Sequence, residues 1–270
     1  MTDSTNTASN TDYDVIIVGA GFGGLTAVHR MRELGFSVRL FEAGSDVGGT
    51  WYWNQYPGLK VDVESVEYSL SFSYVIEQEW TWSERYAGPQ ELCRYANFVA
   101  DRLDLRRDIQ TDTRIDVAEF DEATGIWDLT TNSGEQLRSR FVIMCTGMLN
   151  QPIKPQFKGL DSFEGKQYHS ARWPKEGVDL SEQRVGVIGT GSSGVQIIST
   201  IASQVGHLHV FHRTPGYCLP LRNCAMPEEY STRVKANYGQ WRAAERYNSF
   251  GGWVALNYQI GEPVTGSALD

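Results

Sequence analysis

The sequence predicts an α/β protein with two separate β–α–β units, and the order of its apolar and glycine-rich segments is the main evidence. Over residues 13–43 a β-branched apolar run, a helical pattern and a second apolar run follow one another. The same succession returns over residues 184–213. In both places a glycine-rich turn joins the first strand to the helix, as in parallel strands connected by a crossover helix.

The first unit begins with YDVIIVG (residues 13–19), which is typical of a buried parallel strand. A helix is expected from about residue 23 to 34, because apolar residues recur at helical spacing and Gly35 follows as a stop. FSVRLFEA (residues 36–43) is the second expected strand. Residues 46–62 are rich in glycine and aromatic residues, which indicates an ordered loop after this unit.

The middle of the chain predicts one helix and a small group of strands. Residues 89–105 carry a helical pattern. Residues 113–147 contain the alternating segments RIDVAEF, IWDLTT and EQLRSRFVIMC, separated by the turn signals ATG and NSG. The last segment becomes continuously apolar, as expected of a strand that re-enters a buried sheet. QPIKP (residues 151–155) then predicts a stiff extended connector.

The second unit consists of the expected strand RVGVIG, a helix from residue 193 to about 204, and the strand HLHVFHR. Beyond Pro227 a helical pattern rich in aromatic residues runs toward the end of the chain. Its aromatic residues are Tyr230, Tyr238, Trp241 and Tyr247.

Composition excludes several classes of protein. The 33 acidic against 24 basic residues give a net charge of −9, which disfavours a nucleic-acid partner. The four cysteines form no CxxC pair and have no metal-ligand spacing, so reduced thiols of a cytoplasmic protein without a metal site are expected. The N-terminus lacks the regions of a signal peptide, and no apolar run reaches the length of a membrane span.

Both glycine-rich turns fit the pattern GxGxxG. The first glycine permits a tight turn, the second lets a pyrophosphate approach the backbone, and the third lets the helix pack on the strand. The helix N-terminus then offers its unpaired N–H groups to the phosphates. Each loop therefore predicts a dinucleotide site. The candidate residues are Gly19, Gly21, Phe22 and Gly24 in the first loop, and Gly189, Thr190, Gly191, Ser192, Ser193, Gly194 and Gln196 in and after the second.

The ends of the following strands distinguish the two cofactors. Glu42 lies 23 positions after Gly19, where an acidic side chain accepts the ribose 2′-hydroxyl of FAD or NAD. The same offset from the second loop reaches His212, which is followed by Arg213 and Thr214. A cation at this place suits the 2′-phosphate of NADP. Two different nucleotides on one chain imply electron transfer between them, with NADPH and FAD as the natural pair.

These observations predict two Rossmann-like dinucleotide-binding domains, one for FAD and one for NADP, of the three-layer ββα/βαβ type. Part of a helical insertion is expected at the C-terminal end. The expected ranges are a disordered tail at 1–12, the FAD domain at 13–150, a linker at 151–183, the start of the NADP domain at 184–220, and a helical segment at 221–270.

Two further stretches carry a family resemblance. FEGKQYHSARWP fits the pattern FxGxxxHxxxW[PD] at Phe163, Gly165, His169, Trp173 and Pro174. GGTWYWNQYPGLKVD supplies a second motif at Gly49, Trp51, Tyr56, Pro57, Gly58 and Asp62. With the two glycine loops on either side, the sequence resembles the N-terminal half of the Baeyer–Villiger monooxygenases, the class B flavin-dependent monooxygenases.

The resemblance implies an NADPH- and dioxygen-dependent enzyme that converts ketones to esters or lactones by a peroxyflavin. It implies that Asp62 is a catalytic carboxylate near the flavin, which orients an active-site arginine. Lys60 and Val61 would approach the nicotinamide, and the helical segment at 221–270 would be part of a helical substrate domain. The residues expected around FAD are Gly49, Thr50, Trp51, Trp53, Asp62, Tyr68 and Val117.

The resemblance also implies that the catalytic arginine lies outside this chain, because members of the family are roughly twice as long. We therefore expect these 270 residues to bind FAD weakly and not to oxygenate ketones. Two alternatives remain: an N- or S-oxygenating flavin monooxygenase, and a non-catalytic dinucleotide-binding fragment. Within the segment FEGKQYHSARWPK, His169 and Trp173 are expected to set the relative pose of the two domains rather than to perform chemistry.

Overall fold

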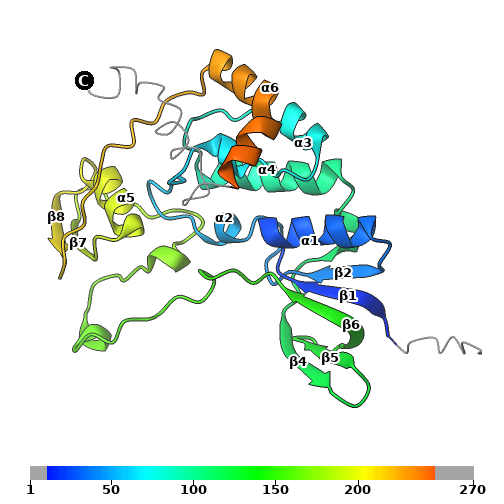
Figure 1. Cartoon of the computed structure of the whole chain (residues 1–270). Helices are drawn as coiled ribbons and strands as arrows, with labels where there is room; N and C mark the ends of the chain where they lie inside the picture. Colours follow the sequence, from blue (N-terminus) through cyan, green and yellow to red (C-terminus); the bar gives the residue numbers. More distant parts are fainter. Residues whose placement is uncertain (1–10, 247–270) are drawn as a thin grey trace, which may run out of the picture. The chain divides into compact units, whose positions relative to one another are not determined.

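The computed structural model describes residues 11–246, which fold into two compact units (Figure 1). Unit 1 combines the chain up to Tyr56 with Leu92–Gly177. Unit 2 combines Pro57–Glu91 with the chain from Val178 onward. Each unit is thus built from two separate stretches, whereas the domain ranges expected from the sequence are continuous.

Unit 1 contains a six-stranded mixed sheet with the strand order β3-β2-β1-β6-β5-β4. The strands β3, β2, β1 and β6 are parallel, and β6, β5 and β4 are antiparallel. The continuous β-branched run of the sequence forms the central strand β1, where Ile16 and Ile17 are fully buried. The strands are β1 (Tyr13–Val18), β2 (Val38–Phe41), β3 (Ile109–Gln110), β4 (Ile115–Asp121), β5 (Ile126–Thr131) and β6 (Gln136–Met144).

Strand β6 joins the two halves of this sheet. Ser139 pairs with Trp127 of antiparallel β5 and also with Tyr13 of parallel β1. The apolar end of β6 then runs beside β1 as far as the pair Val18 and Met144. The segment joins the parallel part of the sheet, as predicted, but its apolar end is not buried, because Phe141 is 48% and Met144 is 60% exposed.

The expected helices of unit 1 are present. Helix α1 (Phe22–Glu33) makes the crossover between β1 and β2 and lies alongside both (Figure 1), with Leu25 and Val28 fully buried. Helix α4 (Pro89–Arg102), which belongs to unit 1 from Leu92 onward, buries the apolar face that its sequence pattern predicts.

The segment expected as an ordered loop over residues 46–62 contains a helix, so that expectation is incomplete. Helix α2 (Thr50–Trp53) is a single turn that follows Gly49, whose φ of 55° suits glycine. Helix α3 (Tyr74–Glu79) is also short and was not predicted. One or two turns are too few for a helical periodicity to appear in the sequence. Short 3₁₀ turns occur at Ser65–Tyr68, Arg106–Asp108, Leu160–Ser162 and Ser170–Arg172.

Unit 2 contains the second β–α–β succession, and this prediction is confirmed. Strands β7 (Arg184–Ile188) and β8 (His207–Phe211) are parallel, and helix α5 (Ser192–Ile201) connects them. Helix α6 (Glu228–Glu245) is the helix expected after Pro227. Tyr247 and the rest of the C-terminus, like most of the expected N-terminal tail, lie outside the described residues.

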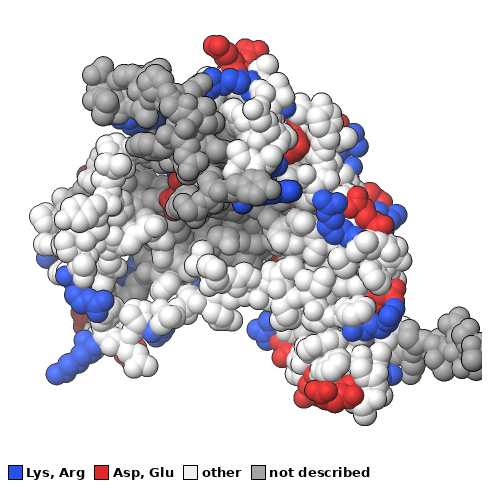
Figure 2. All heavy atoms as spheres, in the orientation of Figure 1, with Lys and Arg blue, Asp and Glu red and all other residues white. Residues whose placement is uncertain are grey.

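Charged side chains of both signs are distributed over the face drawn in Figure 2. Acidic side chains gather at the turn between β4 and β5, where Asp121 and Glu122 lie, and at the start of α6. On this face, Lys and Arg side chains stand among acidic ones and form no continuous basic area. Over residues 11–246, none of the helices has the length and apolar character needed to span a membrane.

Candidate functional site

The first glycine loop has a backbone that side chains would disrupt. Gly19 has a φ of 101°, and a Cβ atom there would lie 2.6 Å from the carbonyl oxygen of Cys145. A Cβ atom on Gly24 would lie 1.9 Å from the carbonyl oxygen of Gly19. Gly21 is the N-cap of α1 and supplies no capping side chain, so the first N–H groups of the helix stay open to a ligand.

Glu42 connects the loop to the end of β2. Its side chain is buried, at 5% exposure, and Oε2 accepts a hydrogen bond of 2.7 Å from the Ala20 amide. Oε1 accepts one of the same length from the Gly44 amide. The carboxylate predicted to bind a ribose therefore also holds the glycine loop in shape.

The second glycine loop repeats this backbone in unit 2. Gly189 has a φ of 105°, against 101° at Gly19, and the N-cap Gly191 has a φ of −75°, against −73° at its counterpart. A Cβ atom on Gly194 would lie 2.3 Å from the carbonyl oxygen of Gly189. A Cβ atom on Gly191 would meet no atom within 4 Å, so the side from which a pyrophosphate would approach is open.

The segment after β8 returns to the second loop. A Cβ atom on Gly216 would lie 3.2 Å from the carbonyl oxygen of Thr190. Arg213 and Thr214, shortly before that glycine, are exposed. The predicted phosphate-binding cation thus belongs to a segment that comes back to the glycine loop.

In unit 1 the structure brings α2 together with the residues around the end of the fingerprint segment. The Nζ atom of Lys175 lies 3.7 Å from the centroid of the Tyr52 ring, and the guanidinium carbon of Arg172 lies 5.8 Å from that of Trp53. The Tyr52 hydroxyl is also within hydrogen-bond distance of the Ser45 hydroxyl, at 2.8 Å. A hydrogen bond from Lys175, and then those with Ser45, lower the pKa of Tyr52.

Inside the fingerprint segment, local contacts dominate. The Nδ1 atom of His169 accepts a hydrogen bond from the Ala171 amide and so caps a short 3₁₀ turn. The Trp173 ring lies 5.4 Å from the ring of Tyr168, centroid to centroid, and Phe163 is 60% exposed. The role of His169 and Trp173 in the relative pose of two domains stays a prediction.

In unit 2 the end of the second motif lies against helix α5. Gly58 has a φ of 78°, and a Cβ atom there would lie 2.0 Å from Oγ1 of Thr200 and 2.5 Å from the carbonyl oxygen of Gln196. The Gln196 side chain donates a 3.0 Å hydrogen bond to the carbonyl oxygen of Lys60. Two candidate residues that lie 136 positions apart in the sequence are therefore in direct contact.

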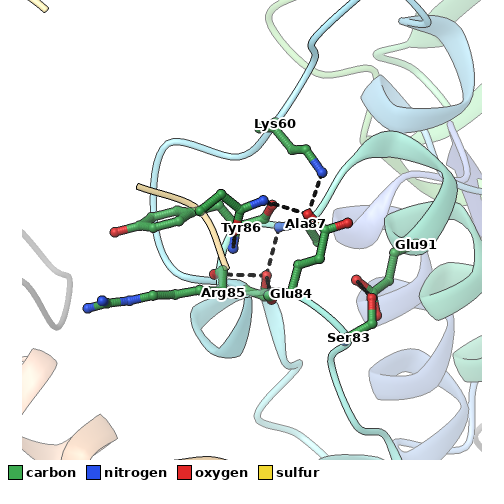
Figure 3. Close-up of polar contacts among 9 residues, drawn as sticks. Lys60, Ser83, Glu84, Arg85, Tyr86, Ala87 and Glu91 are labelled. Carbon is green, nitrogen blue, oxygen red and sulfur yellow. Dashed lines mark hydrogen bonds and ion pairs between the residues drawn. The ribbon is translucent and has the colours of Figure 1, made fainter. Parts of the chain in front are cut away.

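The Lys60 ammonium forms an ion pair with Glu84, with 2.5 Å between Nζ and Oε2 (Figure 3). The neighbouring Val61 is buried, at 1% exposure, and its amide donates to the carbonyl oxygen of Ala87. Asp62 is exposed and follows directly. Side-chain exposure therefore changes from buried at Val61 to exposed at Asp62, the predicted catalytic carboxylate.

The other predicted flavin contacts lie in separate places. Burial, and then the charges of Asp62 and Glu67, raise the pKa of Tyr68 in unit 2. Val117 lies at an irregular point of the edge strand β4 in unit 1 and is 42% exposed. Among the described residues, no three His, Cys, Asp or Glu side chains form a metal-binding group.

Several polar contacts had no signal in the sequence. These contacts join residues that lie far apart in the chain. They are the cation–ring contacts of Lys175 and Arg172, the ion pair of Lys60 with Glu84, and the ion pair of the buried Glu64 with Arg85. No spacing rule links such residues, so only covariation between sequences could have found them.

Two glycine loops of matching geometry, each between a parallel strand and a helix, define a protein of the dinucleotide-binding α/β class. The model of the family "FMO-like: Flavin-binding monooxygenase-like" matches residues 12–222. The chain belongs to this family of flavin-binding monooxygenases.

Two individual relatives show how similar the chain is to particular members of the family. The chain is 45% identical over 232 residues to an acetone monooxygenase (methyl acetate-forming) of Gordonia sp. (strain TY-5), a match that covers 86% of this chain and 44% of the relative. It is 42% identical over 231 residues to phenazine N-monooxygenase PhzNO1 of Lysobacter antibioticus, covering 85% and 42% of the two proteins.

A solved structure of an oxidized steroid monooxygenase bound to NADP is also similar. It is 49% identical, with a TM-score of 0.84, and the match covers 89% of this chain and 46% of that one. The chain thus spans less than half the length of these similar proteins.

Proposed function

We propose that this chain is the nucleotide-binding part of an NADPH- and dioxygen-dependent flavin monooxygenase that converts ketones to esters or lactones. The observation that carries the proposal is the pair of matched glycine loops, one followed by the Glu42 carboxylate and the other by the Arg213 cation. The similarity to acetone monooxygenase supports the ketone as the substrate class.

FAD fits the loop of unit 1. No side chain caps the N-terminus of α1, so its first N–H groups can face a pyrophosphate, and the Gly49 backbone of the second motif lies beside Gly21 of the loop. Each oxygen of Glu42 accepts one backbone hydrogen bond and keeps a second acceptor position for ribose hydroxyls. The residues that would hold FAD are those of the loop, with Glu42 and the motif around α2.

NADP fits the loop of unit 2. The space beside Gly191 admits a pyrophosphate, and Arg213 and Thr214 offer a guanidinium and a hydroxyl to a 2′-phosphate. Gln196 lies on helix α5, which follows this loop. It would act indirectly, because its side chain donates a hydrogen bond to the backbone carbonyl of Lys60.

When bound, NADPH supplies a hydride and the flavin passes electrons to dioxygen, which is the chemistry that amino acids cannot provide. The residues of this chain orient the cofactors and exclude water. The aromatic side chains of α2 would form a dry wall, and Lys175 and Arg172 hold two of those rings. Asp62 would present its exposed carboxylate to a cation of the active site.

The test starts with the purified chain and a titration with FAD followed by flavin fluorescence. We expect weak FAD binding, bleaching of the bound flavin by NADPH, and no ester from a ketone by these 270 residues alone. Extension of the gene along its reading frame to the length of the relatives should restore ketone-dependent NADPH consumption. Robust ketone oxygenation by the 270-residue chain, or a chain that binds no flavin, would contradict the proposal.

A second candidate reaction is oxygenation of nitrogen or sulfur, and the 42% identity to a phenazine N-monooxygenase favours nitrogen. Product analysis of the extended protein with a ketone, an aromatic amine heterocycle and a sulfide distinguishes the two reactions. An ester from the ketone supports the first proposal, and an N-oxide or sulfoxide alone supports the second.

A further inference from the structure

Glu64 lies two residues after Asp62, and the residue is buried, at 4% exposure. A buried charge is costly unless it is paired and hydrogen-bonded. Arg85 donates to Oε1 from Nε at 2.8 Å and from Nη2 at 2.5 Å, and the hydroxyl of Tyr230 donates to Oε2. Both oxygens are therefore engaged, and we call these three residues the Glu64 triad. All of them belong to unit 2.

The triad connects helix α6 to residues 57–68, which we call the strap. Tyr230, Val234, Tyr238 and Arg242 recur every four residues and so lie on one face of α6. Val234 is fully buried and Tyr238 is 5% exposed. The helix therefore turns a continuous stripe of side chains toward the strap and the residues that follow it.

Two more contacts extend this attachment beyond the triad. The Tyr238 hydroxyl lies 2.9 Å from the hydroxyl of Ser69, and Arg242 donates a 2.8 Å hydrogen bond to the buried Glu77. Lys235 on the same helix donates to the carbonyl oxygen of Gln78 at 2.9 Å. The strap and the residues after it are thus held along much of the length of α6.

Asp62 lies between two oppositely charged attachments. Glu84 and Arg85 are adjacent in sequence. Glu84 pairs with Lys60 (Figure 3), and Arg85 pairs with Glu64. Backbone hydrogen bonds reinforce the same alignment: the Val61 amide donates to Ala87 at 3.1 Å, and the Ser65 amide donates to Arg85 at 2.8 Å. The strap is fixed on both sides of the exposed carboxylate.

We propose that Glu64, Arg85 and Tyr230 are positioning residues, which hold Asp62 in the orientation that its proposed role at the flavin requires. This inference rests on the proposed function, because Asp62 is assigned to the flavin site there. Burial, and then the charge of Glu64, raise the pKa of Tyr230, so its hydroxyl stays protonated and donates throughout the neutral range.

The first experiment tests whether the Glu64 triad holds the strap in place. Tyr230→Phe removes only the hydroxyl, and Tyr217→Phe is the matched control because that ring is fully exposed. Amide hydrogen exchange at Val61 and Ser65 should be about tenfold faster in Tyr230→Phe, since a hydrogen bond to a buried charge is lost, and unchanged in the control. Unchanged exchange in Tyr230→Phe would overturn the proposal.

A set of Arg85 variants tests the ion pair between Arg85 and Glu64. Arg85→Met should accelerate exchange at the same two amides more than Tyr230→Phe does, because the buried carboxylate loses its cation. In Arg85→Lys exchange should be slower than in Arg85→Met, since lysine keeps the charge but cannot donate from two guanidinium nitrogens. If Arg85→Met leaves exchange as slow as in the unaltered chain, the triad does not hold the strap.

The second experiment tests whether the triad acts through Asp62. We expect Tyr230→Phe to slow NADPH-dependent bleaching of bound flavin several-fold, and to add no further loss when combined with Asp62→Asn. An equal fold-loss in both backgrounds would indicate a merely structural role and refute the inference. If the unaltered chain binds no flavin, the proposed function fails, and the exchange measurements still decide whether the triad holds the strap.

Discussion

Substitution of Glu42 by Gln changes one atom of a buried side chain and tests the link between loop shape and cofactor binding. One carboxylate oxygen becomes an NH₂ group that faces a backbone N–H donor, while the other oxygen keeps its bond. Loss of one hydrogen bond to a charged acceptor, with a buried donor left unpaired, costs about 2 kcal/mol. For a protein of this size that corresponds to a melting point about 4–8 °C lower.

The measurement is thermal unfolding followed by near-ultraviolet circular dichroism, with a parallel titration of FAD. Glu122→Gln, at the exposed turn between β4 and β5, removes the same charge without changing a buried contact and should melt like the unaltered chain. FAD affinity should fall in Glu42→Gln by more than in the control. A melting point within about 1 °C of the control would refute the inference that Glu42 holds the loop.

Four further predictions concern the second loop, the thiols and the fingerprint segment. Gly194→Ala should destabilise unit 2 by about 3 kcal/mol, because the Cβ atom meets Gly189, and urea unfolding measures this. Gly191→Ala should cost less than about 1 kcal/mol and weaken NADPH binding instead, since its Cβ atom enters open space. Burial raises the pKa of the Cys93 thiol to about 11, so at pH 8 Ellman's reagent should react with it far more slowly than with the two exposed cysteines. Lys175→Met should raise the pKa of Tyr52, visible as a later phenolate absorbance on alkaline titration, because Lys175 favours the deprotonated form.

Much of the fold follows from local patterns. The run YDVIIVG predicts β1 because a strand covered on both faces must be apolar throughout, and the alternating segments predict β4 and β5 because one face is open. The glycines of both loops can also be predicted, since Gly19 and Gly189 take a positive φ and a Cβ atom on Gly24 or Gly194 would clash with the first glycine of its loop. These features depend on neighbours in the sequence, so a single sequence is sufficient to predict them.

The candidate site is less predictable because its contacts are long-range. The sequence suggests Lys60 and Gln196 separately, but not that one donates a hydrogen bond to the other. The burial of Glu64 is equally invisible, because an isolated glutamate in a polar segment is typical of a surface. Such positions are determined by packing between distant segments, which a periodicity cannot express.

Each unit is built from two separate stretches of the chain, and this has a consequence for synthesis on the ribosome. The chain passes from one unit to the other after Tyr56, after Glu91 and after Gly177. The strap and the residues up to Glu91 therefore leave the ribosome long before α5 and α6, which hold them. During that interval Glu64 can pair with Arg85 but not with Tyr230. Nascent chains stopped before residue 178 should expose this stretch to proteases, and release of the later helices should protect it.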